Sequence, residues 1–432
     1  MSAFDHPAAT DIKQPNRPKL TDVLGPGLIT GASDDDPSGI ATYSQAGAQF
    51  GYGLIWTLLL TYPLMCAIQM VSAQIGRVTG KGLAGNMRRH YPLSLLYALV
   101  SLLLMANVIN LGADLGAMAA AIRLLVPGPQ LVYVTAFAFV TVVLEVYLSY
   151  ARYASILRWL TTSLFAYVAT AFVVGVPWRD VALNLVIPHI ELTGSYLTVV
   201  VAMFGTTISP YLFFWQAAEE VEEEKEDPAA KPLTKAPWQA SRELGRIQLD
   251  TVVGMGFSNI VALFIVLTTA ATLNAHGVND IQTSAQAAEA LRPIAGVFTF
   301  TVFALGIVGT GLLAVPVLAA SAAYAVGEAF GWRVGLAQKP ERAPAFYWTI
   351  AAATFVGAGL NFTALDPIKA LFWSAVINGV AAVPIMAMIM LMASRPQVMR
   401  QFTIRPWLKA FGWLATAAMA LAAAGMIVTW GQ

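Results

Sequence analysis

The fold of this chain is decided by residues 24–43, which read LGPGLITGASDDDPSGIATY. Three consecutive aspartates, Asp34, Asp35 and Asp36, stand in a segment that is otherwise small and apolar, as in a membrane-spanning helix. A carboxylate at the centre of a bilayer costs about 2.5–3.5 kcal/mol on insertion scales, so three of them cannot face lipid. Pro37 and Gly39 follow at once and predict a break in the helix. Acids at the break of a helix are typical of the central cation site of a transporter.

The composition indicates a polytopic membrane protein. Of the 432 residues, 57% are hydrophobic and 11% are charged, whereas soluble domains carry about 25% charged residues. The net charge of +1 and the absence of a basic run argue against a nucleic-acid partner. The single cysteine, Cys66, excludes a disulfide within the chain. Residues 1–21 have no apolar core and are expected to form a cytoplasmic tail rather than a signal peptide.

Eleven apolar windows are long enough to cross a bilayer, which takes about 20 helical residues. Their limits are 22–48, 53–75, 93–122, 129–149, 154–176, 195–218, 249–273, 295–326, 345–362, 367–393 and 408–430. With the N-terminus inside, all but four of the 25 Lys and Arg residues lie on the inner side. The outer side keeps Arg123, Arg179, Arg292 and Lys369. This asymmetry predicts eleven spans in an inner (plasma) membrane, with the N-terminus in and the C-terminus out.

The first and sixth spans share an unusual feature. Each has a proline among polar residues at mid-membrane: Pro37 in the first span and Pro210 in the sixth. Because the two lie five spans apart, a second copy of the repeat would be inverted relative to the first. This predicts a LeuT-like 5+5 inverted repeat with broken helices 1 and 6. Residues 22–176 form the first repeat, residues 195–393 the second, and residues 408–430 an additional span.

Several motifs resemble those of the NRAMP divalent-metal transporters. The first-helix motif reads GPG at 25–27, DP at 36–37, AT at 41–42 and QAGAQFGY at 45–52. SAQIGRVTGKGLA at 72–84 resembles the end of the family's second helix, and ADLG at 113–116 its third. Arg246-Ile247, with Asp250 and Thr251, resembles the entry to its seventh. The resemblance implies a LeuT-like fold, metal transport, and Asp36 as the metal-binding aspartate.

The chain also departs from the family pattern. Its first break reads Asp36-Pro37-Ser38-Gly39, where the family has Asp-Pro-Gly-Asn. Its sixth-helix motif is Ser209-Pro210-Tyr211, where the family has Met-Pro-His, and a second family histidine falls on Gln216. Third-helix acids that the family links to proton movement fall on Asn107 and Ala117, although Asp114 remains. These differences indicate a divergent branch.

Asp36 and Ser209 are the predicted metal ligands. The alternative for Asp36 is a cap on the half-helix that follows, and the alternative for Ser209 is a hydrogen bond to its own helix at the proline kink. The rest of the predicted substrate site comprises Ser33, Asp34, Asp35, Gly39, Thr206, Tyr211 and Asn378. Asp114 and Gln216 are expected to relay protons or to support the ligands.

These observations predict a secondary transporter that moves a divalent cation by alternating access. Carboxylate, hydroxyl and carbonyl oxygens favour hard ions such as Mg²⁺ or Mn²⁺. A LeuT-like transporter of a non-metal solute, or a receptor or scaffold without transport activity, are the alternatives. No nucleophile–base set or cofactor motif is visible, so neither an enzyme nor a cofactor is expected.

Overall fold

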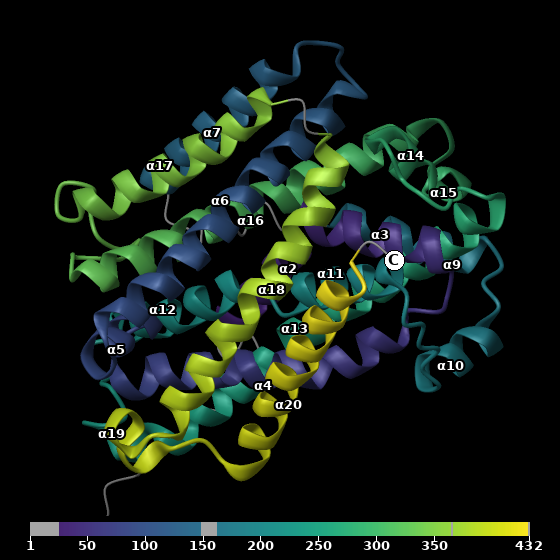
Figure 1. Cartoon of the computed structure of the whole chain (residues 1–432). Helices are drawn as coiled ribbons and strands as arrows, with labels where there is room; N and C mark the ends of the chain where they lie inside the picture. Colours follow the sequence, from purple (N-terminus) through teal and green to yellow (C-terminus); the bar gives the residue numbers. More distant parts are fainter. Residues whose placement is uncertain (1–25, 148–161, 364–365, 431–432) are drawn as a thin grey trace, which may run out of the picture.

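The computed structural model describes residues 26–147, 162–363 and 366–430, and every regular element in these ranges is helical (Figure 1). The predicted tail at 1–21 and part of the predicted fifth span lie outside the described residues. The α-helices are α2 Pro26–Asp34, α3 Pro37–Phe50, α4 Trp56–Thr79, α5 Leu83–His90, α6 Leu93–Arg123, α7 Gln130–Tyr147, α9 Phe165–Val173, α10 Trp178–Val186, α11 Gly194–Thr207, α12 Pro210–Glu226, α13 Ala240–Thr272, α14 Ser284–Glu289, α15 Arg292–Ala295, α16 Thr299–Phe330, α17 Pro344–Gly359, α18 Pro367–Ser394, α19 Pro396–Met399 and α20 Pro406–Val428. Short 3₁₀ turns occupy η1 Thr162–Leu164, η2 Pro237–Gln239, η3 Asn274–His276, η4 Gly296–Phe298, η5 Leu360–Phe362 and η6 Arg400–Phe402.

Nine helical segments in the described ranges are long and apolar enough to cross a membrane. A tenth span is possible if the η1–α9 segment and α10, which bend by 114° at their junction, count as one. The first predicted span is formed by α2 and α3, each too short to cross a bilayer alone. The number of eleven spans and the orientation remain predictions.

Both predicted helix breaks are confirmed, and a proline begins the second half of each. Helix α2 ends at Asp34 and α3 begins at Pro37, while α11 ends at Thr207 and α12 begins at Pro210. Proline fits the first position of a helix because its missing N–H would have no partner there. The two prolines therefore end one half-helix and start the next at the positions that the sequence indicates.

Helices α2 and α3 lie inside the bundle, where α2 packs on α13 and α3 packs on α13, α18 and α11. Two glycines allow close backbone approaches. A Cβ atom at Gly31 would lie 2.2 Å from the backbone oxygen of Gly254 on α13. A Cβ atom at Gly205 would lie 2.0 Å from the backbone oxygen of Ala375 on α18. The broken helices are thus held against α13 and α18 at distances that no larger residue permits.

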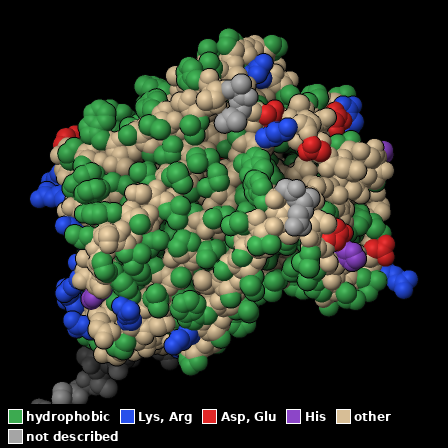
Figure 2. Space-filling view, viewed as in Figure 1, with side chains coloured by type: hydrophobic (Ala, Val, Ile, Leu, Met, Phe, Trp, Pro, Cys, Tyr) green, Lys and Arg blue, Asp and Glu red, His purple; other side chains and the backbone are tan. Residues whose placement is uncertain are grey.

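The surface suits a bilayer. Figure 2 shows a face covered mainly by hydrophobic side chains, with Lys and Arg gathered at the lower-left edge, where Figure 1 places α5 and α19. Large apolar side chains on this protein are widely exposed, among them Phe139 at 61% and Leu421 at 74%. Such an apolar surface between charged ends is what contact with acyl chains requires.

Candidate metal centre

The two helix breaks meet in the interior. A Cβ atom at Gly39 would lie 3.1 Å from Thr206 Oγ1, so the start of α3 touches the end of α11. The Tyr211 hydroxyl donates to the Ser33 carbonyl at 3.1 Å and joins α12 to α2. Ser33, Thr206 and Tyr211, predicted from the sequence to lie at one site, are therefore together and buried.

Asp36 lies between the two half-helices and is 3% exposed. Its Oδ1 accepts from the backbone N–H of Gly39 at 2.6 Å and caps α3. Its Oδ2 accepts from Asn110 Nδ2 on α6 at 3.0 Å. The capping role is therefore present. A carboxylate offers about four lone-pair sites, so these two bonds leave capacity for a cation.

Asp34 and Asp35 turn toward α13 rather than toward α6. Ser258 Oγ lies 2.8 Å from Asp34 Oδ2 and 3.0 Å from Asp35 Oδ1. A hydroxyl has one proton to donate, so it can satisfy only one of these carboxylates at a time. Asp34 Oδ1 has no hydrogen-bond partner among the described residues. The three consecutive acids are thus divided between two neighbouring helices.

Asp114 on α6 faces the same region. Asn110 Nδ2 lies 3.5 Å from Asp114 Oδ2, so one amide stands between Asp114 and Asp36. Asp34, Asp35, Asp36 and Asp114 are all 3% exposed or less. None of them forms an ion pair with a Lys, Arg or His in the described parts of the chain. Buried charge of this kind must be balanced by a cation or by protons.

Ser209 makes hydrogen bonds at the proline kink, which was the alternative to a role as a metal ligand. Its Oγ lies 2.9 Å from the carbonyl oxygens of both Gly205 and Thr206 in the last turn of α11, across the proline kink. The hydroxyl proton is used there, while its lone pairs stay available. Asn378 on α18 is buried, and its Oδ1 has no hydrogen-bond partner in the described ranges.

Gln216 is fully buried in α12, about two turns beyond the break. Both polar atoms of its amide lack hydrogen-bond partners among the residues that the structure covers. No group of three or more His, Cys, Asp and Glu side chains that could hold a metal was found in the same residues. Hydroxyl, amide or backbone oxygens must therefore complete any metal site built on Asp36.

Sequence reasoning missed two partners of the acids, Asn110 and Ser258. Asn110 stands four residues before Asp114, and residues at this spacing share one helix face. Ser258 precedes Asn259, which is a polar residue in the apolar segment that forms α13. A systematic search for polar residues on the faces that contact the broken helix would have found both.

The family model described as natural resistance-associated macrophage protein-like (Nramp) matches residues 27–429. The chain belongs to the Nramp family. A curated relative, the divalent metal cation transporter MntH of Klebsiella pneumoniae (strain 342), is 26% identical over 406 residues, which are 91% of each chain. The predicted family is therefore confirmed.

Solved structures show that this Nramp protein has the expected fold. The Eremococcus coleocola manganese transporter, in complex with an aromatic bis-isothiourea compound, matches with a TM-score of 0.71 and 18% identity, over 94% of this chain and 86% of that one. Mhp1 in its inward-facing conformation matches with a TM-score of 0.51 and 14% identity, over 94% of this chain and 90% of that one. The LeuT-like fold is confirmed, and the Nramp assignment confirms a membrane transporter rather than an enzyme.

Proposed function

We propose that this Nramp protein moves a divalent metal cation across the membrane by alternating access, with Asp36 as its principal ligand. The observation that supports the proposal is the set of four buried carboxylates without a basic partner in the described residues. A permanently paired structural acid would have an Arg or Lys beside it. Carboxylates that bind a transported cation would have no permanent Arg or Lys partner.

The donor set supports a hard ion. The groups around the two breaks are carboxylates, hydroxyls, an amide and backbone carbonyls, and oxygen ligands suit Mg²⁺, Ca²⁺ and Mn²⁺. Ser209 and Tyr211 stand where the resemblance implies a thioether and an imidazole. The site therefore has little chemical basis for excluding the abundant hard ions, and Mg²⁺ is the first candidate alongside Mn²⁺.

Asp36→Asn tests the proposal in proteoliposomes. The amide oxygen can still accept from Gly39 and keep the cap, while the negative charge is lost. We expect normal folding and the loss of most Mg²⁺ and Mn²⁺ uptake. The exposed residue Asp180 on α10 provides the matched control, and Asp180→Asn should transport like the wild type.

Unchanged uptake in Asp36→Asn would remove Asp36 from the site. Absence of flux for every divalent ion in the wild-type protein, with binding of a non-metal solute or of a protein partner, would favour the alternatives of a solute transporter or a scaffold.

A further inference from the structure

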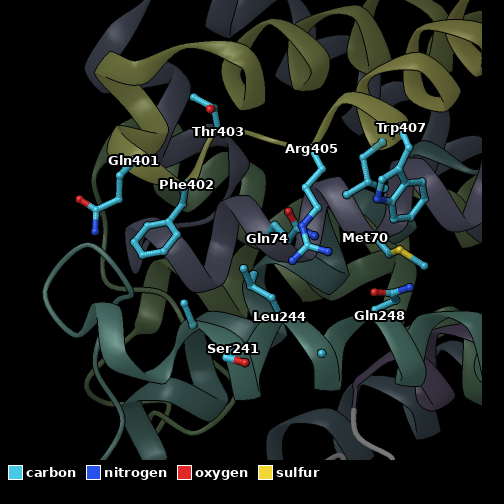
Figure 3. A pocket seen from close by; sticks show the side chains of 13 residues that line it. Met70, Gln74, Ser241, Leu244, Gln248, Gln401, Phe402, Thr403, Arg405 and Trp407 are labelled. Carbon is cyan, nitrogen blue, oxygen red and sulfur yellow. The ribbon is translucent and has the colours of Figure 1, made fainter.

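A pocket lies away from the helix breaks, at the end of the molecule where α19 and the start of α20 lie. It has a volume of about 550 Å³, within the range of ligand sites. Its walls come from α4, from the first turns of α13 and from residues 401–408 (Figure 3). None of the residues proposed above to bind the transported cation lines it.

A cation projects into this pocket. Figure 3 shows the Arg405 side chain reaching from the segment before α20 toward Gln74 and α13. Arg405 forms no ion pair with the described residues, whereas the neighbouring Arg77 and Arg246 each bind glutamates. The first turn of α20 adds the backbone N–H groups of Trp407 and Leu408, which have no carbonyl partner earlier in the helix. A guanidinium beside a helix N-terminus favours an anion.

Gln74 gives a second and independent indication of a ligand. It is only 9% exposed, yet its amide makes no hydrogen bond with any residue that the structure describes. Its side chain lies beside the Arg405 guanidinium in the pocket (Figure 3). The Gln74 amide has no partner among the described residues and lies at the pocket, so its N–H groups can donate to a ligand that enters there.

The surroundings favour a lipid over a soluble anion. Trp407 at the pocket is 40% exposed, and amphipathic Trp is common at the level of lipid headgroups. Exposed apolar side chains continue along α20 beyond Trp407, at Phe411 and Leu414. A headgroup in the pocket would therefore have acyl-chain surface next to it. The positive-inside asymmetry places this end of the molecule at the inner leaflet, where anionic lipids gather.

We propose that the pocket between α4, α13 and the start of α20 binds the phosphate headgroup of an anionic phospholipid, through Arg405, Gln74 and the N-terminus of α20. The lipid would join three helices that otherwise leave a cavity between them. This site is separate from the transported cation and does not depend on its identity.

Native mass spectrometry of the full chain tests the proposal, with phosphatidylglycerol and phosphatidylcholine of matched acyl chains as probes. The wild type should retain phosphatidylglycerol preferentially. Because a charge-assisted hydrogen bond is lost, Arg405→Gln should weaken its binding about tenfold, while Arg405→Lys should keep part of it. The exposed Lys339 provides the charge-matched control, and Lys339→Gln should bind like the wild type.

Gln74→Leu separates binding from folding. Because the Gln74 amide makes no hydrogen bond with the described residues, its removal should leave the melting temperature without lipid unchanged, while phosphatidylglycerol retention falls several-fold. Equal retention of the two lipids by the wild type would overturn the proposal. So would unchanged phosphatidylglycerol retention in Arg405→Gln, or stabilisation by inorganic phosphate alone that depends on Arg405 while the lipid has no effect.

Discussion

At the scale of single residues, the central feature is the sharing of donors among buried acids. Asn110 lies between Asp36 and Asp114, and Ser258 lies between Asp34 and Asp35. In each case one polar group serves two carboxylates, and Asp34 Oδ1 and Asp114 Oδ1 have no hydrogen-bond partner among the described residues. This leaves negative charge only partly satisfied, which suits a site that must attract a cation and later release it.

Asn110→Leu should therefore weaken divalent-cation binding about tenfold, because a hydrogen bond to a charged group contributes about 1.5–3 kcal/mol and its loss frees Asp36 to move. Isothermal titration with Mn²⁺ and Mg²⁺ measures this. Since both residues act on one carboxylate, adding Asn110→Leu to Asp36→Asn should have little further effect. Simply additive losses in the double variant would show that Asn110 does not act through Asp36.

At the scale of elements, ion pairs tie α4, α12 and α13 together at one end of the bundle. Arg246 binds Glu220 and lies 3.3 Å from Glu223 Oε2. Arg77 lies 3.4 Å from both Glu224 Oε2 and Glu243 Oε2. Part of the acidic run at the end of α12 is buried, since the Glu220 side chain is 0% exposed. Its periodicity places some glutamates against α13 and others in solvent.

Arg246→Gln should destabilise the protein by roughly 3 kcal/mol, since removing one partner strands a buried charge on Glu220. Arg242 lies one turn earlier on the same helix, with its side chain 88% exposed, and is the matched control. Arg242→Gln should change stability by less than about 0.5 kcal/mol. Thermal unfolding in detergent compares the two, and equal melting temperatures would mean that the network contributes nothing to stability.

Helix α6 carries the prediction about proton coupling. Asn107, at a position where the resemblance implies an acid, donates to the Leu318 carbonyl at 3.0 Å and to Ser321 at 2.8 Å on α16. Asn107 thus links α6 to α16, and its amide, unlike a carboxyl group, cannot release a proton. Tyr211 and Gln216 stand where the resemblance implies histidines, so α12 carries no imidazole that could titrate along this path.

We therefore expect substrate uptake without accompanying proton uptake, measured with a pH-sensitive dye inside proteoliposomes. Asp114→Asn is the diagnostic variant, because Asp114 is the acid that α6 retains near the site. Substrate-driven acidification that disappears in Asp114→Asn would restore a proton-coupled importer.

At the scale of the whole molecule, charge and apolar surface define an axis across the membrane. Lys and Arg gather at the end that carries α5 and α19, and hydrophobic side chains cover the face between the ends (Figure 2). The segment after α12, which includes Ala230, hydrogen-bonds to the end of α4 at this same end, through Leu233 and Arg77. The positive-inside rule assigns this end to the cytoplasm.

A cysteine at Ala230 should accordingly resist a membrane-impermeant thiol reagent in intact cells and react after permeabilisation. A cysteine at His189, in the predicted outer segment and well exposed, should react in both conditions. The native Cys66 is buried and supplies the background. Reversed labelling of the two positions would invert the proposed orientation.

The sequence by itself determined the features that local physics dictates. Hydropathy defined the apolar segments because a bilayer demands about 20 apolar residues for each crossing. Pro37 and Pro210 defined the breaks because proline cannot continue a helix. The three aspartates marked the site because their charge cannot face lipid.

Only the tertiary structure decided which groups these residues meet. The partners Ser258 and Asn110 lie 224 and 74 positions away from Asp34 and Asp36, respectively. Whether the Ser209 hydroxyl faces a ligand or the end of α11, and whether Gln74 finds a partner, depends on how each helix is rotated and how closely its neighbours approach. Those distances follow from contacts such as that of Gly31 with Gly254, which a single-sequence pattern does not encode.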